Sequence, residues 1–208
     1  MKSVLIQLKP NPEQYKSLRL LQQTFAEICN VIYRVVQDSR CWNRVGLHHM
    51  VYHNVREMFP GTGSQIICNA IYAVSRTSRL VFQDLDSPWY DQVKQNVKLP
   101  KIIFLPQSPV FLDTHTISFT KQTLSIYTLN GRIHFDMKMF DIEKSDFFAK
   151  KYKEILLLNH GDDFFLKFIF SDAMNKAGEK GNIIDFPKSI MIFKDDSELD
   201  VNQNKAAC

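Results

Sequence analysis

Residues 117–135, ISFTKQTLSIYTLNGRIHF, decide the fold class of this chain. Apolar and polar residues alternate on both sides of Asn130-Gly131, as they do in two half-buried strands joined by a tight turn. A type I′ turn requires positive φ at both central residues, and Asn-Gly is a pair that tolerates this. The stretch therefore predicts an antiparallel meander, with strands near 116–120, 123–129 and 132–138.

A two-residue loop at Asn130-Gly131 would fix the register of the hairpin, pairing Leu129 with Arg132 and Tyr127 with His134. One face then carries Tyr127, Arg132 and His134. The other face is core and carries Leu124, Ile126 and Phe135. An aromatic ring, an imidazole and a guanidinium on one sheet surface could bind a phosphate backbone and a base, or they could be ordinary solvated hairpin residues.

The composition is that of a globular chain. Its 208 residues suffice for one domain or two small ones, and 45% hydrophobic with 23% charged residues excludes a disordered chain. No apolar run reaches the ~18 residues of a membrane span, and the N-terminus has no signal-peptide pattern. The four cysteines form no CxxC pair, so we expect a reducing, cytoplasmic setting and no zinc knuckle.

The charge is uneven along the chain. Residues 1–83 hold ten Lys/Arg against four Asp/Glu, whereas residues 154–208 hold six against ten. A basic front suggests a polyanion partner for the first part of the chain.

Before the meander, the sequence predicts one strand and three helices. A strand over 4–8 is followed by Asn11 as N-cap and Pro12 at the first helical position. Apolar spacing then predicts helices over 12–37, 47–59 and 64–83. The second helix would bury a stripe made of Leu47, Val51, Val55 and Met58.

After these helices, a looser segment over 84–109 leads to a short strand at 110–112 and the meander. A short helix is expected at 145–151, a hairpin turning at His160-Gly161-Asp162, and an apolar run at 190–193. This order favours an α+β fold in which a helical domain is inserted into an antiparallel β-barrel or sheet.

Two helical faces are candidate sites. His49 and His53 have the i,i+4 spacing that can clamp a metal, but no Glu lies between them and no third ligand is evident. Tyr52 and Arg56 share their face, which could contact nucleic acid or be merely solvated. The third helix carries a polar stripe opposite its buried one, and this stripe consists of Asn69, Tyr72, Arg76, Arg79 and Gln83.

Enzyme chemistry has little support in the sequence. It contains no Gly-rich phosphate loop, no GxSxG elbow and no Cys/His pair at a catalytic spacing. The Asp162-Asp163 pair belongs to a hairpin turn, where turn chemistry explains it.

Five segments in order resemble one family. They are KPNPEQ (9–14), TFAEICNVIYRVV (24–36), the run from Leu47 to Phe82, PVFLDTHTISFTKQTLSIYTLNGRIHF (109–135) and GDDFFLKFIF (161–170). Together they resemble the N-terminal half of TnpB proteins, the RNA-guided nucleases of insertion sequences that are related to type V CRISPR effectors. The matching positions are Tyr52, Arg56, Phe59, Gln65, Ala70 and Val74 in the helical run, and Phe119, Ser125, Thr128, Leu129, Gly131 and Arg132 in the meander.

The resemblance implies a wedge-like β-barrel with a three-helix recognition domain inserted after the first strand. The expected domains are residues 1–10 as the first barrel strand, 11–85 as the inserted domain, 86–170 as the rest of the barrel, and 171–208 as a partly disordered extension. In the family these parts grip the guide RNA, its heteroduplex with the target and the adjacent duplex, while base pairing reads the sequence.

The chain departs from the family where the nuclease would follow. The G-x-D-x-G motif of the RuvC-like part and the paired CxxC of the zinc ribbon are absent, and Asp185 is not bracketed by glycines. Two-metal cleavage needs several converging carboxylates. We therefore expect a non-catalytic module without a cofactor.

The leading hypothesis is binding of structured, guide-like RNA, with duplex or target DNA and a separate nuclease chain or a second copy as further partners. We expect its arginines, including Arg56, Arg76 and Arg132, to share one concave surface. The expected contact residues are Arg34, Tyr52, Arg56, Gln65, Asn69, Tyr72, Arg76, Arg79, Lys121, Tyr127, Arg132 and His134. Two alternatives remain open: a protein-interaction or regulatory remnant using the Phe-rich stretch 164–170, and a small metal-dependent enzyme centred on His49 and His53.

Overall fold

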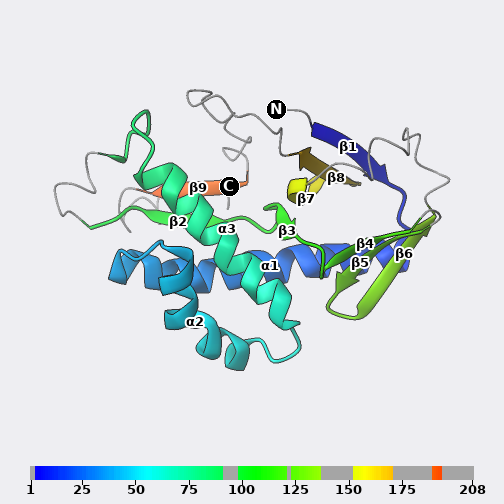
Figure 1. Ribbon diagram of the computed structural model, residues 1–208, viewed down its shortest axis with the longest axis horizontal. Coiled ribbons are helices and arrows are strands. Elements are labelled where there is room, and N and C mark those ends of the chain that lie inside the picture. Colours follow the sequence, from blue (N-terminus) through cyan, green and yellow to red (C-terminus); the bar gives the residue numbers. More distant parts are fainter. Residues whose placement is uncertain (1–2, 91–97, 121–122, 137–151, 171–188, 194–208) are drawn as a thin grey trace, which may run out of the picture. The chain divides into compact units, whose positions relative to one another are not determined.

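The computed structural model describes residues 3–90, 98–120, 123–136, 152–170 and 189–193. These residues form an α+β fold of three helices and antiparallel sheets, as the sequence predicts (Figure 1). Within the described part of the chain no sheet closes into a barrel. The chain divides into two compact units, of which unit 1 comprises residues 1–24 and 107–186, and unit 2 comprises 25–106 and 187–208.

The described residues of unit 1 form two sheets. The four-stranded sheet has the order β1-β8-β7-β3, with β1 at Ser3–Leu8, β3 at Val110–Leu112, β7 at Tyr152–His160 and β8 at Asp163–Phe170. The three-stranded sheet is the predicted meander, with β4 at Ile117–Phe119, β5 at Thr123–Thr128 and β6 at Gly131–Asp136. Rings of Phe119, Tyr152 and Phe168 contact one another with centroids 5.5–6.1 Å apart, so an aromatic cluster packs between the two sheets.

The turn of the meander differs from the prediction. Thr128 pairs with Gly131, so Leu129 and Asn130 are the central residues, and of the turn residues only Gly131 has positive φ, at 99°. The predicted type I′ turn on Asn130-Gly131 is therefore wrong, because Asn130 does not adopt the positive φ that it needs. The register moves by two residues, which leaves the same side chains on each face and pairs Tyr127 with Arg132.

The β7–β8 hairpin turns at the predicted position. Gly161 has φ 63° and, with Asp162, forms a two-residue loop between paired His160 and Asp163. Glycine with positive φ at the first loop position is the pattern of a type II′ turn. The Phe-rich stretch of β8 is buried within the chain, with Phe164 and Phe168 both 0% exposed, so the prediction that 164–170 offers an open apolar surface is wrong.

The three helices lie close to their predicted bounds, with α1 at Pro12–Ser39, α2 at Arg44–Met58 and α3 at Ser64–Phe82. Asn11 caps α1 as expected, since its Oδ1 accepts from Gln14 N–H at 2.9 Å while Gln14 Oε1 accepts from Asn11 N–H at 2.9 Å. Asn43 caps α2, which therefore begins three residues before the expected start. Met58 is 59% exposed, not buried as predicted, because it ends the helix beyond the last buried residue, Val55.

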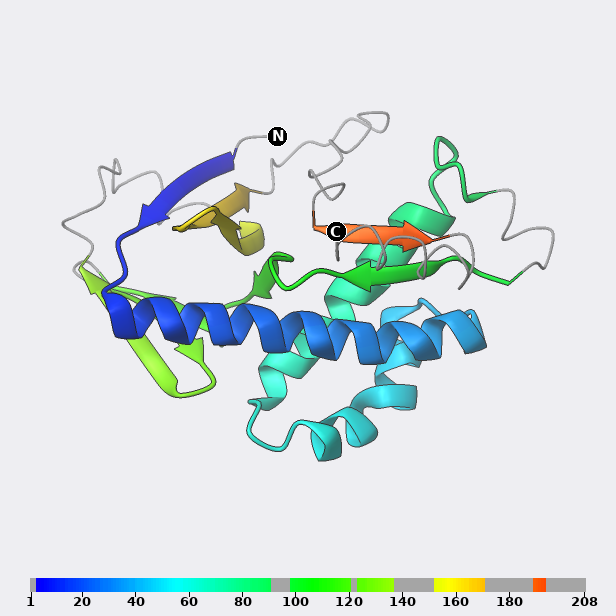
Figure 2. The same cartoon turned by 180° about the vertical axis from the view of Figure 1, so that it is seen from behind.

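Unit 2 also contains a two-stranded ribbon of β2 (Lys101–Phe104) and β9 (Ile190–Phe193). The sequence predicts the apolar run of β9, but β2 lies inside the segment expected to be irregular. In both views the second half of α1 lies between this ribbon and α2 (Figures 1 and 2).

Side chains of α1 hold the backbone of the ribbon. Asn30 Nδ2 donates to the Phe104 carbonyl at 2.9 Å, and Phe104 N–H donates back to Asn30 Oδ1 at 2.7 Å. Tyr33 donates its hydroxyl to the Pro100 carbonyl, and Gln37 Nε2 donates to the Leu99 carbonyl at 2.9 Å. Burial raises the pKa of Tyr33 well above its ordinary value, which keeps the hydroxyl a donor.

Two predicted features lie outside the described residues: the short helix at 145–151 and most of the extension at 171–208. Among the helices of the described part, none has the length and apolar character needed to cross a membrane.

Replacing Gly131 by Ala should lower the free energy of unfolding by about 1 kcal/mol, because an L side chain is strained at φ 99°. The added methyl group would meet no atom within 4 Å, so the loss would report the backbone alone. Urea unfolding measures it. Gly61→Ala is the matched control, because its methyl group is equally unobstructed and no positive φ is required there. Equal stability of the two variants would contradict the turn assignment.

Asn30→Asp should destabilise the protein by about 1–3 kcal/mol at neutral pH, because it removes the donor to Phe104 and places a carboxylate against a carbonyl oxygen. Glu27→Gln makes the reverse amide–carboxylate exchange at an exposed position of the same helix and should be nearly neutral. Thermal unfolding of both variants tests the difference, and a neutral Asn30→Asp would show that this contact is dispensable.

Candidate nucleic-acid interface

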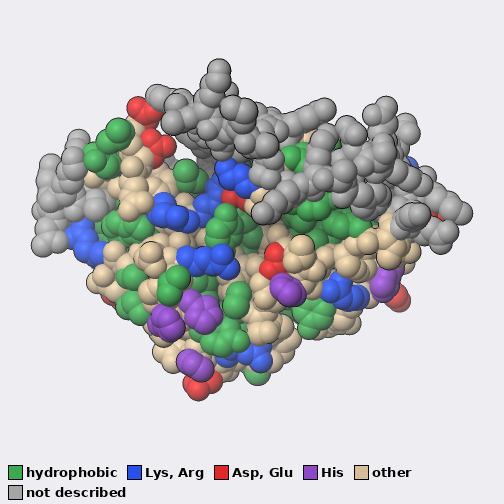
Figure 3. Space-filling view, in the orientation of Figure 1, with side chains coloured by type: hydrophobic (Ala, Val, Ile, Leu, Met, Phe, Trp, Pro, Cys, Tyr) green, Lys and Arg blue, Asp and Glu red, His purple; other side chains and the backbone are tan. Residues whose placement is uncertain are grey.

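The polar side chains of α3 and the start of α2 form what we name the α2–α3 basic face, which consists of Arg44, Tyr72, Arg76, Arg79 and Gln83. The Arg44 guanidinium carbon lies 5.2 Å from the centre of the Tyr72 ring, a cation–π distance. Arg44 follows the N-cap Asn43 directly, so the capping residue of α2 sets its position. Figure 3 shows Lys and Arg side chains over α3 on the same face as His side chains over α2.

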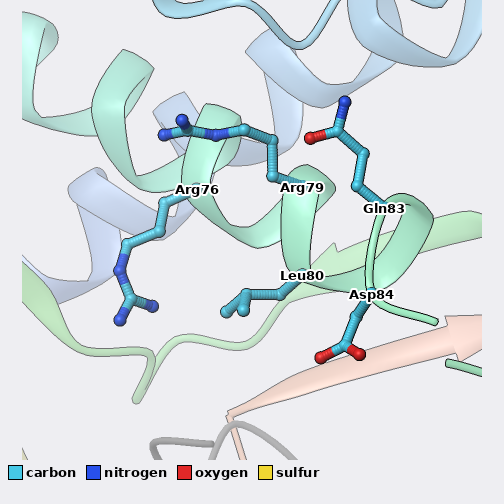
Figure 4. Close-up of a pocket in the computed structure, with 5 residues that line it drawn as sticks. All are labelled: Arg76, Arg79, Leu80, Gln83 and Asp84. Atoms are coloured by element: carbon cyan, nitrogen blue, oxygen red, sulfur yellow. The ribbon is translucent and has the colours of Figure 1, made fainter. Parts of the chain in front are cut away.

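An open pocket of about 360 Å³ lies at the C-terminal half of α3 and is lined by Arg76, Arg79, Leu80, Gln83 and Asp84 (Figure 4). In that view the Arg76 side chain extends on the side of Leu80 and Asp84, while Arg79 extends on the side of Gln83. Arg79 is exposed and makes a long contact, 3.4 Å, from Nε to the Ser75 carbonyl of its own helix. Its charge is therefore available to a ligand.

The first member of the predicted stripe is not on the open surface. Asn69 is only 6% exposed, and Gln65 Nε2 approaches its Oδ1 at 3.4 Å. The helix α3 is buried on most of its circumference, because it packs within unit 2 on more than one side. The prediction that Asn69 lies opposite the buried stripe is therefore wrong, whereas Arg79 and Gln83 are exposed as expected.

A cluster of rings covers α2. His48 stacks on Tyr52 with centroids 4.7 Å apart and an interplanar angle of 17°, and His49 and His53 contact this pair edge-on. His48 Nε2 also lies 3.9 Å from Cys68 Sγ on α3. No group of three or more metal-ligating side chains occurs among the residues that the structure describes, so His49 and His53 gain no third ligand there.

Arg56 has a structural contact. Its Nη1 donates to the Thr62 carbonyl in the loop between α2 and α3, and Thr62 is buried. This guanidinium therefore closes the α2–α3 connection, and the side chain is half-buried.

In unit 1, Arg132 is held by its own sheet. Its Nη1 donates to Ser125 Oγ at 3.0 Å and its Nη2 to the His115 carbonyl at 2.7 Å, while its guanidinium carbon lies 5.9 Å from the Tyr127 ring centre. His134 is exposed on the same face, and its carbonyl accepts from Gln14 Nε2 at 2.9 Å. Arg132 thus ties β5, β6 and the turn before β4 together.

Two further predicted contact residues are Arg34 and Lys121. Arg34 is exposed on α1, and Lys121 lies outside the described residues. Arg132 belongs to unit 1 whereas Arg56 and Arg76 belong to unit 2, so one shared concave surface stays a prediction.

Three residues of this region are not among those predicted from the sequence: Arg44, His48 and Cys68. The apolar stripe of α2 starts at Leu47 and places the helix start there, although the N-cap signal of Asn43 would have included Arg44. The proximity of His48 and Cys68 depends on how α2 packs on α3, and no spacing in the sequence encodes it.

No model of a known protein family and no curated protein matches this sequence.

Substitution of Arg56 and of Arg79 should affect the stability of the protein differently. Arg56→Ala should lower the free energy of unfolding by about 1–2 kcal/mol, because the buried Thr62 carbonyl loses its donor. Arg79→Ala removes the same charge from an exposed position and should change it by less than about 0.5 kcal/mol. Chemical unfolding of both variants measures this, and equal losses would contradict the structural assignment of Arg56.

Proposed function

We propose that this chain is a non-catalytic nucleic-acid-binding module that grips structured RNA through the α2–α3 basic face. The observation that carries the proposal is the grouping of Arg76, Arg79 and Gln83 around an open pocket, on the helix that also presents Tyr72 to Arg44.

These residue types suit a nucleic-acid backbone. Guanidinium groups bind phosphate oxygens in a bidentate manner, and amide side chains add hydrogen bonds to phosphate and sugar. Aromatic rings stack on unpaired bases, and a guanidinium above a ring can extend such a stack. Helices α2 and α3 contain four arginines and one acidic residue, Glu57. The electrostatic potential of these two helices is therefore positive and favours binding of a polyanion.

Rigid support also favours binding at this face. Helix α3 is anchored by buried residues such as Ile67, Ile71 and Val74, and Ser75 Oγ donates to the Trp42 carbonyl at 2.6 Å. Arginines on a fixed helix lose less conformational entropy on binding than arginines on a loop.

The resemblance to TnpB gives the proposal its partner class. On this interpretation α1–α3 correspond to the recognition part, the antiparallel sheets correspond to the wedge part, and the chain acts in the cytoplasm. The RNA is guide-like, duplex or target DNA is a second ligand, and cleavage belongs to a separate nuclease chain. Because the described sheets do not close into a barrel, the proposal rests on the helices. Exposed His134 with Tyr127 offers a second contact region on unit 1.

Binding is tested with a labelled RNA stem-loop that has single-stranded tails, titrated at several salt concentrations. The double substitution Arg76→Gln and Arg79→Gln should raise Kd roughly tenfold or more at low salt. A plot of the logarithm of the binding constant against the logarithm of salt concentration has a negative slope. The magnitude of this slope should fall by about 1 for each phosphate that the variant no longer neutralises.

The matched control is Lys9→Gln with Lys16→Gln, which removes the same charge from exposed positions of unit 1. This variant should keep most of the affinity. Equal losses in both variants would show that net charge, not the α2–α3 basic face, governs binding. A wild-type protein that fails to bind the stem-loop at low ionic strength would overturn the proposed function.

A further inference from the structure

A thiol and an imidazole that are distant in the sequence meet in unit 2. Cys68 Sγ on α3 lies 3.9 Å from His48 Nε2 on α2, and both side chains are half-buried. The His48 ring is held in place by its stack on Tyr52, with centroids 4.7 Å apart. A fixed imidazole nitrogen beside a thiol can hold the thiol proton and stabilise the thiolate.

The surroundings of the pair are electropositive. Arg44 lies over the ring of Tyr72, which is one turn along α3 from Cys68. His48 has ring contacts with His49 and Tyr52, neither of which is a carboxylate.

The other described cysteines lack this arrangement. Cys29 is 0% exposed, and burial raises the pKa of its thiol well above the ordinary value, so it should be inert. Cys41 and Cys68 are both half-buried. The Cys41 sulfur, however, packs against Gly46, and a β-carbon added to Gly46 would lie only 3.0 Å from it. Cys41 is therefore a natural reference thiol within the same unit.

We propose that Cys68 is a reactive thiol of this protein, activated by His48, and a site of reversible modification by small-molecule disulfides. The Cys68 thiolate attacks one sulfur of the disulfide, the S–S bond breaks, and a mixed disulfide forms at Cys68. The second half of the reagent leaves as a thiolate and takes up the proton that His48 held. Cys68 is oxidised and the leaving half is reduced, so no further reactant is needed. This inference is independent of RNA binding.

The test compares two proteins in a Cys208→Ser background, one carrying Cys41→Ser and the other Cys68→Ser. Each is treated with dithiodipyridine, a neutral disulfide whose released thione is followed by absorbance, so charge steering does not affect the rates. Cys68 should react at least about threefold faster than Cys41 at pH 7, because an imidazole that stabilises the thiolate raises its fraction more than it lowers its nucleophilicity.

His48→Gln and His48→Phe should each slow Cys68 by roughly three- to tenfold and leave the rate of Cys41 unchanged. The Phe variant keeps a ring stacked on Tyr52, so a slower rate shared by both variants reports the imidazole and not the packing. The pH profile of the Cys68 rate should shift to higher pH in both. In denaturant the two cysteines should react at similar rates.

Two results would overturn the proposal. One is a Cys68 that reacts no faster than Cys41 in the folded protein. The other is a His48→Phe variant, folded by circular dichroism, whose Cys68 rate and pH profile match those of the parent.

Discussion

The structure depends on side chains of α1 that hydrogen-bond to the backbone of residues 99–108. Gln22, 0% exposed, donates to the Gln107 and Ser108 carbonyls in unit 1, and Asn30, Tyr33 and Gln37 bind Phe104, Pro100 and Leu99 in unit 2. A buried peptide group without a partner is costly, and a two-stranded ribbon such as β2–β9 is marginal alone. Side chains of one helix therefore satisfy backbone groups that, among the described residues, belong to no sheet larger than the two-stranded β2–β9 ribbon.

The same logic distinguishes arginines that stabilise the fold from arginines that can bind a ligand. Arg56 and Arg132 donate to backbone carbonyls of loops, so both guanidinium groups contribute to the fold. Arg79 is exposed, but most of the other surface of its helix, α3, is buried. The backbone of Arg79 is therefore held in place while its charge faces solvent. A basic sequence pattern cannot separate these roles, because both place an arginine on a polar face. The α2–α3 basic face is the region where charge, rings and rigid support coincide.

Features governed by local chemistry could be predicted well. Asn11-Pro12 starts α1 and Gly161 turns the β7–β8 hairpin, because capping and positive φ depend on a few adjacent residues. The meander turn shows the limit of such signals. Asn-Gly fits a type I′ turn, but it also fits a turn in which glycine follows the two central residues, and the structure adopts the second. Strand β2 cannot be predicted from its own residues, because its partner β9 lies far along the chain and the pairing has no local signature.

Residue patterns along the chain suffice to predict the α+β class, the three helices and the residues that share a face of the meander, because periodicity fixes the direction of each side chain within its own element. Which of those side chains meet across elements depends on how the elements pack in the folded chain. The contact of His48 with Cys68, the burial of Asn69 and the loop contact of Arg56 all follow from how α2, α3 and their connection pack. Periodicity predicts which face of a helix is buried, but it does not predict which element packs against that face.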